Sequence, residues 1–324
     1  MSTAGMVKRF TFLLPVELHG EIIKHAVENC KCAADFVQYL LVSHFFYTHF
    51  YPKLMEAITL NRPSQLPKLY FTLESTANQD RLSMEFLTKT LSITCEVNRK
   101  THRRACEKIL RRIRVHKLLL LFKPWQALLD QFHTVFSPTL EELHIHAEYL
   151  PENLYDVEED NSDDMTVGNN FPSSVQRLHV IFELTEGASR IAGRIDFAHL
   201  RNLTHIWLTF DDSDAQSPGD DFRVTEVLPL PDIGDWINHY CPDDLQVLIL
   251  EKDGGVESPL EDEEYRKYVD LPLVCLVNDG SIDLKYLADE EKPYAEQLTF
   301  DAEGFTAEQI WEHSLAMVAQ KNSK

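Results

Sequence analysis

The stretch Leu203-Thr204-His205-Ile206-Trp207-Leu208 has the pattern L-x-x-L-x-L, and this pattern indicates the fold class. Its last two apolar positions alternate with other residues, as positions on one face of a β-strand do. The first apolar position is expected to enter the core just before the strand. The pattern recurs, with substitutions, at Leu66, Leu69 and Phe71; at Val115, Leu118 and Leu120; at Leu140, Leu143 and Ile145; at Val175, Leu178 and Val180; at Leu245, Leu248 and Leu250; and, without its third apolar residue because Asn278 stands there, at Leu273 and Leu276.

The spacing of these copies is irregular. Their first positions differ by 49, 25, 35, 28, 42 and 28 residues, whereas regular leucine-rich repeats run at roughly 20–29 residues. The residues between copies often have a helical pattern, for example at Met84–Thr94 and Thr101–Ile113. A strand followed by a helix cannot bury its apolar face alone, so neighbouring units must stack. The helices then serve as crossover connections, which predicts an α/β fold with a parallel sheet.

The second and third apolar positions of the copies predict one continuous core. The residues named for it are Leu143, Ile145, Leu178, Val180, Ile206, Leu208, Leu248 and Leu250. Trp207 stands between two of these positions, so we expect it on the opposite side, toward helices or solvent.

Acidic residues gather in three blocks, and the chain has a net charge of -21. The blocks fall between copies of the pattern and predict loop insertions at residues 152–170, 211–221 and 251–264, the first of them disordered. They can be solvated loops or an acidic face for a basic partner. The negative charge disfavours general electrostatic binding of nucleic acid or of an anionic membrane.

Basic residues gather in one short stretch. Its members are Arg99, Lys100, Arg103, Arg104, Lys108, Arg111, Arg112, Arg114 and Lys117. We expect a solvated helix face near the acidic loops. A nucleic-acid patch is the less favoured alternative, because the stretch lacks interleaved aromatic residues.

The two ends of the chain carry further helices. Leu14-Pro15 opens a helix, because proline is tolerated in a first turn, and residues 57–60 read as a strand. Thr306 begins a final amphipathic helix that has Ile310, Trp311, Leu315 and Val318 on one side and is expected to cap the last strands. The chain therefore divides into a helical module over residues 12–60 and an α/β domain over residues 61–324.

The N-terminal module resembles an F-box of the form common in fungal proteins, where a degenerate leucine-rich-repeat-like region follows the box. The resemblance is carried by Leu14-Pro15-Val16-Glu17-Leu18, Ile22-Ile23, Leu40-Leu41-Val42-Ser43, Phe46, Pro52, Leu54 and Ile58-Thr59-Leu60, and downstream by Leu203–Leu208 and Pro242–Leu248. It implies a substrate receptor that docks the linker subunit of a cullin-type ubiquitin ligase and selects a protein substrate. The implied docking residues are Leu14, Pro15, Leu18, Ile22, Ile23, Leu40, Leu41 and Val42. Alternatively, these apolar residues pack on each other as core, and the protein is an interaction scaffold outside any ligase.

Two groups of residues are candidate metal ligands. His144, His146 and Glu148 would share one face of a strand, as metal ligands or as a polar solvent-facing surface opposite Leu143 and Ile145. The solvent-facing surface is the favoured interpretation, and a metal-dependent enzyme is the less favoured one.

The second group is Cys30 and Cys32 near His19 and His25, where free thiols are favoured over zinc because a matching second ligand pair is missing. No phosphate-binding glycine loop and no G-x-S-x-G motif occurs. The sequence thus predicts a protein without catalysis, cofactor or metal.

The compartment is indicated by cysteine usage. Six scattered cysteines in a chain of 324 residues are typical of reduced thiols in the cytoplasm or nucleus. No signal peptide is recognised, and the longest apolar runs are too short to span a bilayer.

Overall fold

The structure is a computed structural model. It describes residues 21–22, 24–25, 51–77, 88–129, 136, 138–150, 171–183, 195–198, 200–211, 233–253, 271, 273–278, 299–301 and 306–323. The chain divides into two compact units, residues 1–58 and 59–324. In the first unit, residues 21–22, 24–25 and 51–56 are helical.

Nine strands and six helical segments with assigned bounds are found among the described residues. The strands are β1 (Ala57–Leu60), β2 (Thr90–Ile93), β3 (Lys117–Leu120), β4 (Glu142–His146), β5 (Arg177–Glu183), β6 (His205–Asp211), β7 (Val247–Asp253), β8 (Val274–Asn278) and β9 (Thr299–Asp301). The helical segments are α4 (Gln65–Ala77), α6 (Lys100–Arg112), α7 (Gln126–Leu129), the 3₁₀ turn η1 (Ala147–Tyr149), α10 (Ile233–Tyr240) and α13 (Ala307–Lys321).

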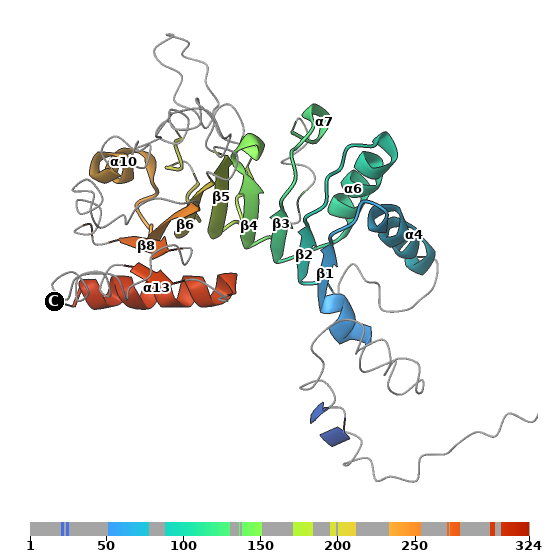
Figure 1. Cartoon of the computed structure of the whole chain (residues 1–324), viewed down its shortest axis with the longest axis horizontal. Helices are drawn as coiled ribbons and strands as arrows, with labels where there is room; N and C mark the ends of the chain where they lie inside the picture. Colours follow the sequence, from blue (N-terminus) through green and yellow to red (C-terminus); the bar gives the residue numbers. More distant parts are fainter. Residues whose placement is uncertain are drawn as a thin grey trace, which may run out of the picture. The chain divides into compact units, whose positions relative to one another are not determined.

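The strands form one sheet in chain order, from β1 to β9 (Figure 1). Every pairing from β2 to β9 is parallel. Parallel neighbours that are consecutive in sequence need a crossover connection between them. The predicted α/β fold with a parallel sheet is confirmed, as is the predicted strand Ala57–Leu60.

The apolar positions of successive strands pair in register. Leu143 lies beside Leu178, which lies beside Ile206, and Ile206 lies beside Leu248. All eight residues named for the core are at most 2% exposed. The prediction of one continuous core is therefore confirmed, and the first positions of these copies, such as Leu140 and Leu203, are buried as well.

The backbone at the starts of strands β3 to β7 repeats one hydrogen-bond arrangement. The carbonyl oxygens of Lys89, His116, Glu141, Gln176 and Thr204 each accept from two successive N–H groups of the next unit, at 2.8–3.4 Å. These bonds fix the start of each strand from β3 to β7 relative to the previous strand. Units of unequal length can therefore stack in register, because extra residues are accommodated between strands.

Two sequence predictions near the N-terminal edge of the sheet are wrong. Leu66, Leu69 and Phe71 lie in helix α4, where Leu66, Leu69 and Leu73 share a buried side at helical spacing and Phe71 is 67% exposed. The predicted helix Met84–Thr94 contains strand β2 instead, with residues 84–87 outside the described part. The apolar pattern did not reveal β2, because the first position of the L-x-x-L-x-L pattern is occupied here by Thr88, which is polar but buried.

Two further corrections concern strand ends. The last copy of the pattern starts two residues earlier than predicted, because Val274 and Leu276 pair with Leu248 and Leu250 while Leu273 packs on the opposite face. Strand β6 extends to Asp211 and β7 to Asp253, so these acidic residues belong to strands. The rest of the predicted acidic insertions, 152–170, 212–221 and 254–264, lies outside the described residues.

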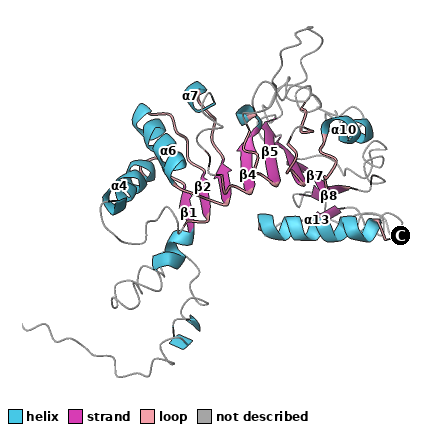
Figure 2. Ribbon diagram, turned by 180° about the vertical axis from the view of Figure 1, so that it is seen from behind, coloured by secondary structure: helices cyan, strands magenta, loops and turns pink. Residues whose placement is uncertain are grey.

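The helices lie on both sides of the sheet. Helices α4, α6, α7 and α10 lie on one side and α13 lies on the other, in both views (Figures 1 and 2). Thr306 caps α13 in a capping box with Gln309, and the predicted helix over the last strands is confirmed. Trp207 faces α13, as expected from strand alternation, and packs with Val247, Ile249, Cys275, Ile310, Trp311 and Val318. We call this side of the sheet the α13 face.

No helix in the described part of the chain is both long and apolar enough to cross a bilayer.

Candidate functional site

Three charged residues and a histidine line up at the amino ends of neighbouring strands on the α13 face. Lys117, Glu142, Arg177 and His205 are the first residues of β3, β4, β5 and β6, and they lie side by side in register. Beside them is a pocket of about 270 Å³. It is lined by His116, Lys117, Glu141, Glu142, Gln176, Arg177 and Glu308, so its wall combines three strand starts with the first turn of α13.

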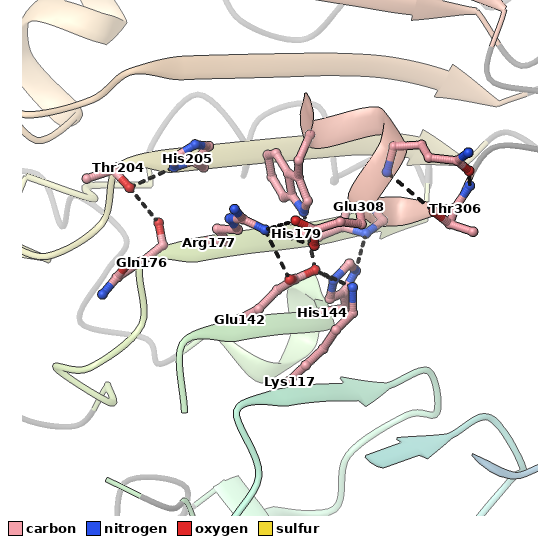
Figure 3. Close-up of polar contacts among 12 residues, drawn as sticks. Lys117, Glu142, His144, Gln176, Arg177, His179, Thr204, His205, Thr306 and Glu308 are labelled. Atoms are coloured by element: carbon pink, nitrogen blue, oxygen red, sulfur yellow. Dashed lines mark hydrogen bonds and ion pairs between the residues drawn. The ribbon is translucent and has the colours of Figure 1, made fainter. Parts of the chain in front are cut away.

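Glu142 is the centre of this group (Figure 3). Its Oε1 lies 2.6 Å from Lys117 Nζ and 2.6 Å from His144 Nε2. The same oxygen accepts a hydrogen bond of 3.2 Å from the indole N–H of Trp311. Burial alone would raise the pKa of this carboxyl, but hydrogen bonds and charges from His144 and Lys117 outweigh burial and lower the pKa to about 2. Glu142 is therefore a buried carboxylate that ties β3, β4 and α13 together.

A row of polar contacts continues across the sheet. His144 Nδ1 lies 2.9 Å from His179 Nδ1, and His179 Nε2 lies 2.8 Å from Thr209 Oγ1. The Thr209 hydroxyl donates to Glu251 over 2.6 Å, and the Trp207 indole N–H donates to the same carboxylate over 2.9 Å. Burial lowers the pKa of His144 and of His179. Together with Glu142, these side chains form a hydrogen-bonded row from β4 to β7.

The Trp207 ring stacks on this row. The ring centroids of His179 and Trp207 are 3.9 Å apart and the rings are nearly parallel, at 7°. Trp311 meets Trp207 edge to face at 5.6 Å. Trp207 thus covers the polar row and also packs against α13. This packing shields His144 and His179 from water.

His205 is the next residue along the row of strand starts. Its Nδ1 lies 2.7 Å from Thr204 Oγ1, and its ring meets Trp311 edge to face. Burial, followed by the positive charge of Arg177, lowers its pKa to about 4. Within the described residues its Nε2 has no hydrogen-bond partner.

Arg177 joins the strand starts to the first turn of α13. Its guanidinium donates two hydrogen bonds to Glu308, of 2.9 and 3.0 Å, and lies 3.7 Å from Glu142. Both cations of the pocket, Lys117 and Arg177, thus face carboxylates. The described lining of the pocket thus consists of charged and polar side chains that pair with one another and anchor α13 to the strand starts.

The predicted alternation of His144, His146 and Glu148 ends at His146. Glu148 lies in η1 and is exposed, because the strand gives way to a 3₁₀ turn at Ala147. His144 is only 3% exposed, so the prediction of a solvent-facing surface is wrong at this residue. No set of three His, Cys, Asp or Glu side chains in the described ranges is arranged to hold a metal ion.

The implied docking residues are described at one position only. Ile22 is helical and 42% exposed, whereas Leu14, Pro15, Leu18, Ile23, Leu40, Leu41 and Val42 lie outside the described residues. Cys30, Cys32 and His19 lie outside them too. Cys95, Cys106, Cys241 and Cys275 are buried thiols that form no disulfide, and burial raises the pKa of each thiol.

Sequence reasoning did not single out Glu142, Arg177, His179 or Glu308. A usable signal exists, since polar residues at the non-core positions of consecutive strands must share one face. What could not be read locally was that α13 would cover that face. No protein-family model matches the chain, and no curated protein matches it in sequence.

Proposed function

We propose that this protein is a non-enzymatic adaptor in the cytoplasm or nucleus. It acts as a substrate receptor of a cullin-type ubiquitin ligase, with an F-box-like module at residues 12–60 and a leucine-rich-repeat-like domain at residues 61–324. The module docks the linker subunit, and the repeat-like domain binds a protein substrate.

The observation that carries this proposal is the stacking of the strand units. Six consecutive strands, β3 to β8, place equivalent apolar residues in register, as in Leu118, Leu143 and Leu178. Stacked strand units are the architecture that repeat proteins use for extended binding surfaces. The motif that resembles an F-box precedes this array, which is the domain order that the resemblance implies.

Exposure of Ile22 supports the docking half of the proposal. Apart from Phe71, Ile22 is the only exposed large apolar residue in the described part of the chain. This exposure leaves the Ile22 side chain accessible to a partner. Ile22 belongs to the residues that the resemblance assigns to linker docking.

Binding of purified full-length chain to the purified linker subunit tests the proposal. We expect a stable complex by size-exclusion chromatography, and we expect the double variant Ile22→Asp, Leu41→Asp to lose it, because charges would be desolvated at the interface. Glu21→Gln, on the same helical segment as Ile22, is the matched control and should bind as the parent does. Circular dichroism checks that the double variant is folded.

The competing role is a scaffold outside any ligase. A folded parent chain that forms no complex with the linker subunit supports the scaffold and removes the ligase proposal. A folded double variant that still binds the linker removes the assigned docking surface.

A further inference from the structure

A stripe of cations runs along the exposed side of α6. Lys100, Arg104 and Lys108 follow one another at intervals of four residues and are exposed, and Arg111 continues the stripe one turn further. The buried side of α6 faces the protein interior through Ala105, Cys106, Ile109 and Leu110. The cations therefore project away from the core.

The net charge of the segment that contains the stripe is opposite in sign to that of the rest of the chain. Residues 99–117 contain nine basic residues and one acidic residue, Glu107, whereas the rest holds 22 basic and 51 acidic residues. Glu107 is engaged elsewhere, since it accepts a hydrogen bond of 3.0 Å from the Trp125 indole. Like charges at four-residue spacing repel along a helix, so the stripe is electrostatically complementary to an anion laid along it.

One aromatic residue of α4, Tyr70, contacts the stripe, and the exposed Phe71 lies next to Tyr70. Helices α4 and α6 lie side by side (Figures 1 and 2). Lys108 Nζ lies 2.7 Å from the Tyr70 hydroxyl and 4.6 Å from the Tyr70 ring centroid. Phe71 is 67% exposed, and its ring centroid is 6.0 Å from that of Tyr70. Arginine and aromatic residues are enriched where proteins bind proteins.

The spacing of the cations along α6 matches a partner segment in the extended conformation. Positions four residues apart on a helix are separated by about 6 Å along its axis. Alternate residues of an extended peptide are separated by about 6.7 Å. Carboxylates at alternate positions of an extended segment would thus meet Lys100, Arg104 and Lys108 in turn, with an apolar residue beside them reaching Phe71.

We infer that this surface of α4 and α6 binds an acidic, extended segment of a partner protein that carries carboxylates at alternate positions and a flanking apolar residue. The inference rests on the proposed function, because it names the chemistry of the segment that the repeat-like domain would select. The two fail separately, since linker docking involves residues 12–60 and this surface lies on α4 and α6.

Fluorescence anisotropy with the full chain tests the inference. The probe is a labelled peptide of about ten residues, long enough to follow the stripe when extended, in which Glu alternates with Ser and one Phe flanks the run. We expect saturable binding that weakens as ionic strength rises, because the contacts are exposed and screened by salt. The same peptide with Gln in place of Glu should not bind.

Charge reversal locates the site. Lys100→Glu with Arg104→Glu should weaken binding on the order of tenfold or more, since attraction becomes repulsion. Phe71→Ala should weaken it less. Arg201→Glu, an exposed position in the turn before β6, makes the same kind of charge change away from α6 and should have little effect. Circular dichroism confirms folding of each variant.

Three results would overturn the inference. One is the absence of binding by the parent chain. This result would also be obtained if the acidic blocks of the chain itself occupied the stripe. Another is equal binding by the parent and the Lys100→Glu, Arg104→Glu variant. The third is tighter binding of a labelled single-stranded oligonucleotide than of the acidic peptide, which would assign the stripe to nucleic acid.

Discussion

The indole N–H of Trp311 donates a hydrogen bond of 3.2 Å to the Glu142 carboxylate, across 169 residues of chain. This contact joins α13 to the amino end of β4, and Glu308 joins the same helix to Arg177 on β5. The C-terminal helix is therefore held to the sheet by one buried and one exposed polar contact as well as by apolar packing. The following predictions test which of these contacts matter for stability.

Replacing Glu142 should destabilise the fold strongly. Glu142→Ala leaves Lys117, His144 and Trp311 without their shared acceptor, and a buried group that loses its partner costs about 2–4 kcal/mol. Urea denaturation measures the loss. Glu141→Ala, at the exposed neighbouring position, is the control and should stay within about 0.5 kcal/mol of the parent. Equal effects of the two substitutions would contradict the central role of Glu142.

Trp311→Ala should loosen α13 from the sheet. Trp311 is fully buried against Trp207, so truncation leaves a large cavity and costs about 3–5 kcal/mol. Thermal unfolding checks the effect, with Glu312→Ala on the exposed side of the same helix as the control. Unchanged stability of Trp311→Ala would mean that α13 does not contribute to the folded core in solution.

Leu248→Ala tests the continuous core. Leu248 is fully buried and lies in register between Ile206 and Val274, so its truncation should cost about 2–5 kcal/mol. Chemical denaturation measures this cost, and Gln246→Ala, exposed two residues earlier, should change little. A small effect at Leu248 would show that the strand units do not share one core.

Stability should fall on acidification. Burial lowers the pKa of His205 to about 4, whereas the unfolded side chain titrates near 6.5, so the unfolded chain binds more protons between these values. The free energy of unfolding therefore decreases as pH falls through that window, and the lowered pKa values of His144 and His179 act in the same direction. Below about pH 4.5, protonation of Glu142, whose pKa is lowered to about 2, adds to the loss.

Urea midpoints measured between about pH 7.5 and about pH 5 check this pH dependence. His205→Gln should show a shallower dependence on pH than the parent, because one buried imidazole is removed. His116→Gln removes an exposed imidazole and is the matched substitution for comparison. A parent chain with constant stability over this range would refute the burial of neutral histidines.

Much of the fold could be predicted from local patterns. Alternation in stretches such as Leu178-His179-Val180 marks a strand whatever its surroundings, and it named a core that is buried throughout. The same reasoning failed where two periods overlap. Leu66, Leu69 and Phe71 fit a strand pattern, but Leu66, Leu69 and Leu73 fit a helix, and the helix formed because it buries three leucines together.

The candidate site could be predicted only in part. The sequence placed His144 and His146 opposite the core, yet it could not tell that His144 would be buried against His179. Their proximity depends on which strands become neighbours, and strand order arises from the stacking of whole units.

The sequence by itself determined strands β3 to β7, their core positions and the amphipathic C-terminal helix, because each depends on the spacing of residues that are close along the chain. Only the tertiary structure decided which face α13 covers, and therefore that Glu142 and Trp311 meet. Contacts between residues so distant in sequence depend on where an apolar helix face finds the largest complementary surface. For α13 that surface consists of Trp207, Val247, Ile249 and Cys275. These four residues lie on three adjacent strands, so the surface exists only after the sheet has formed.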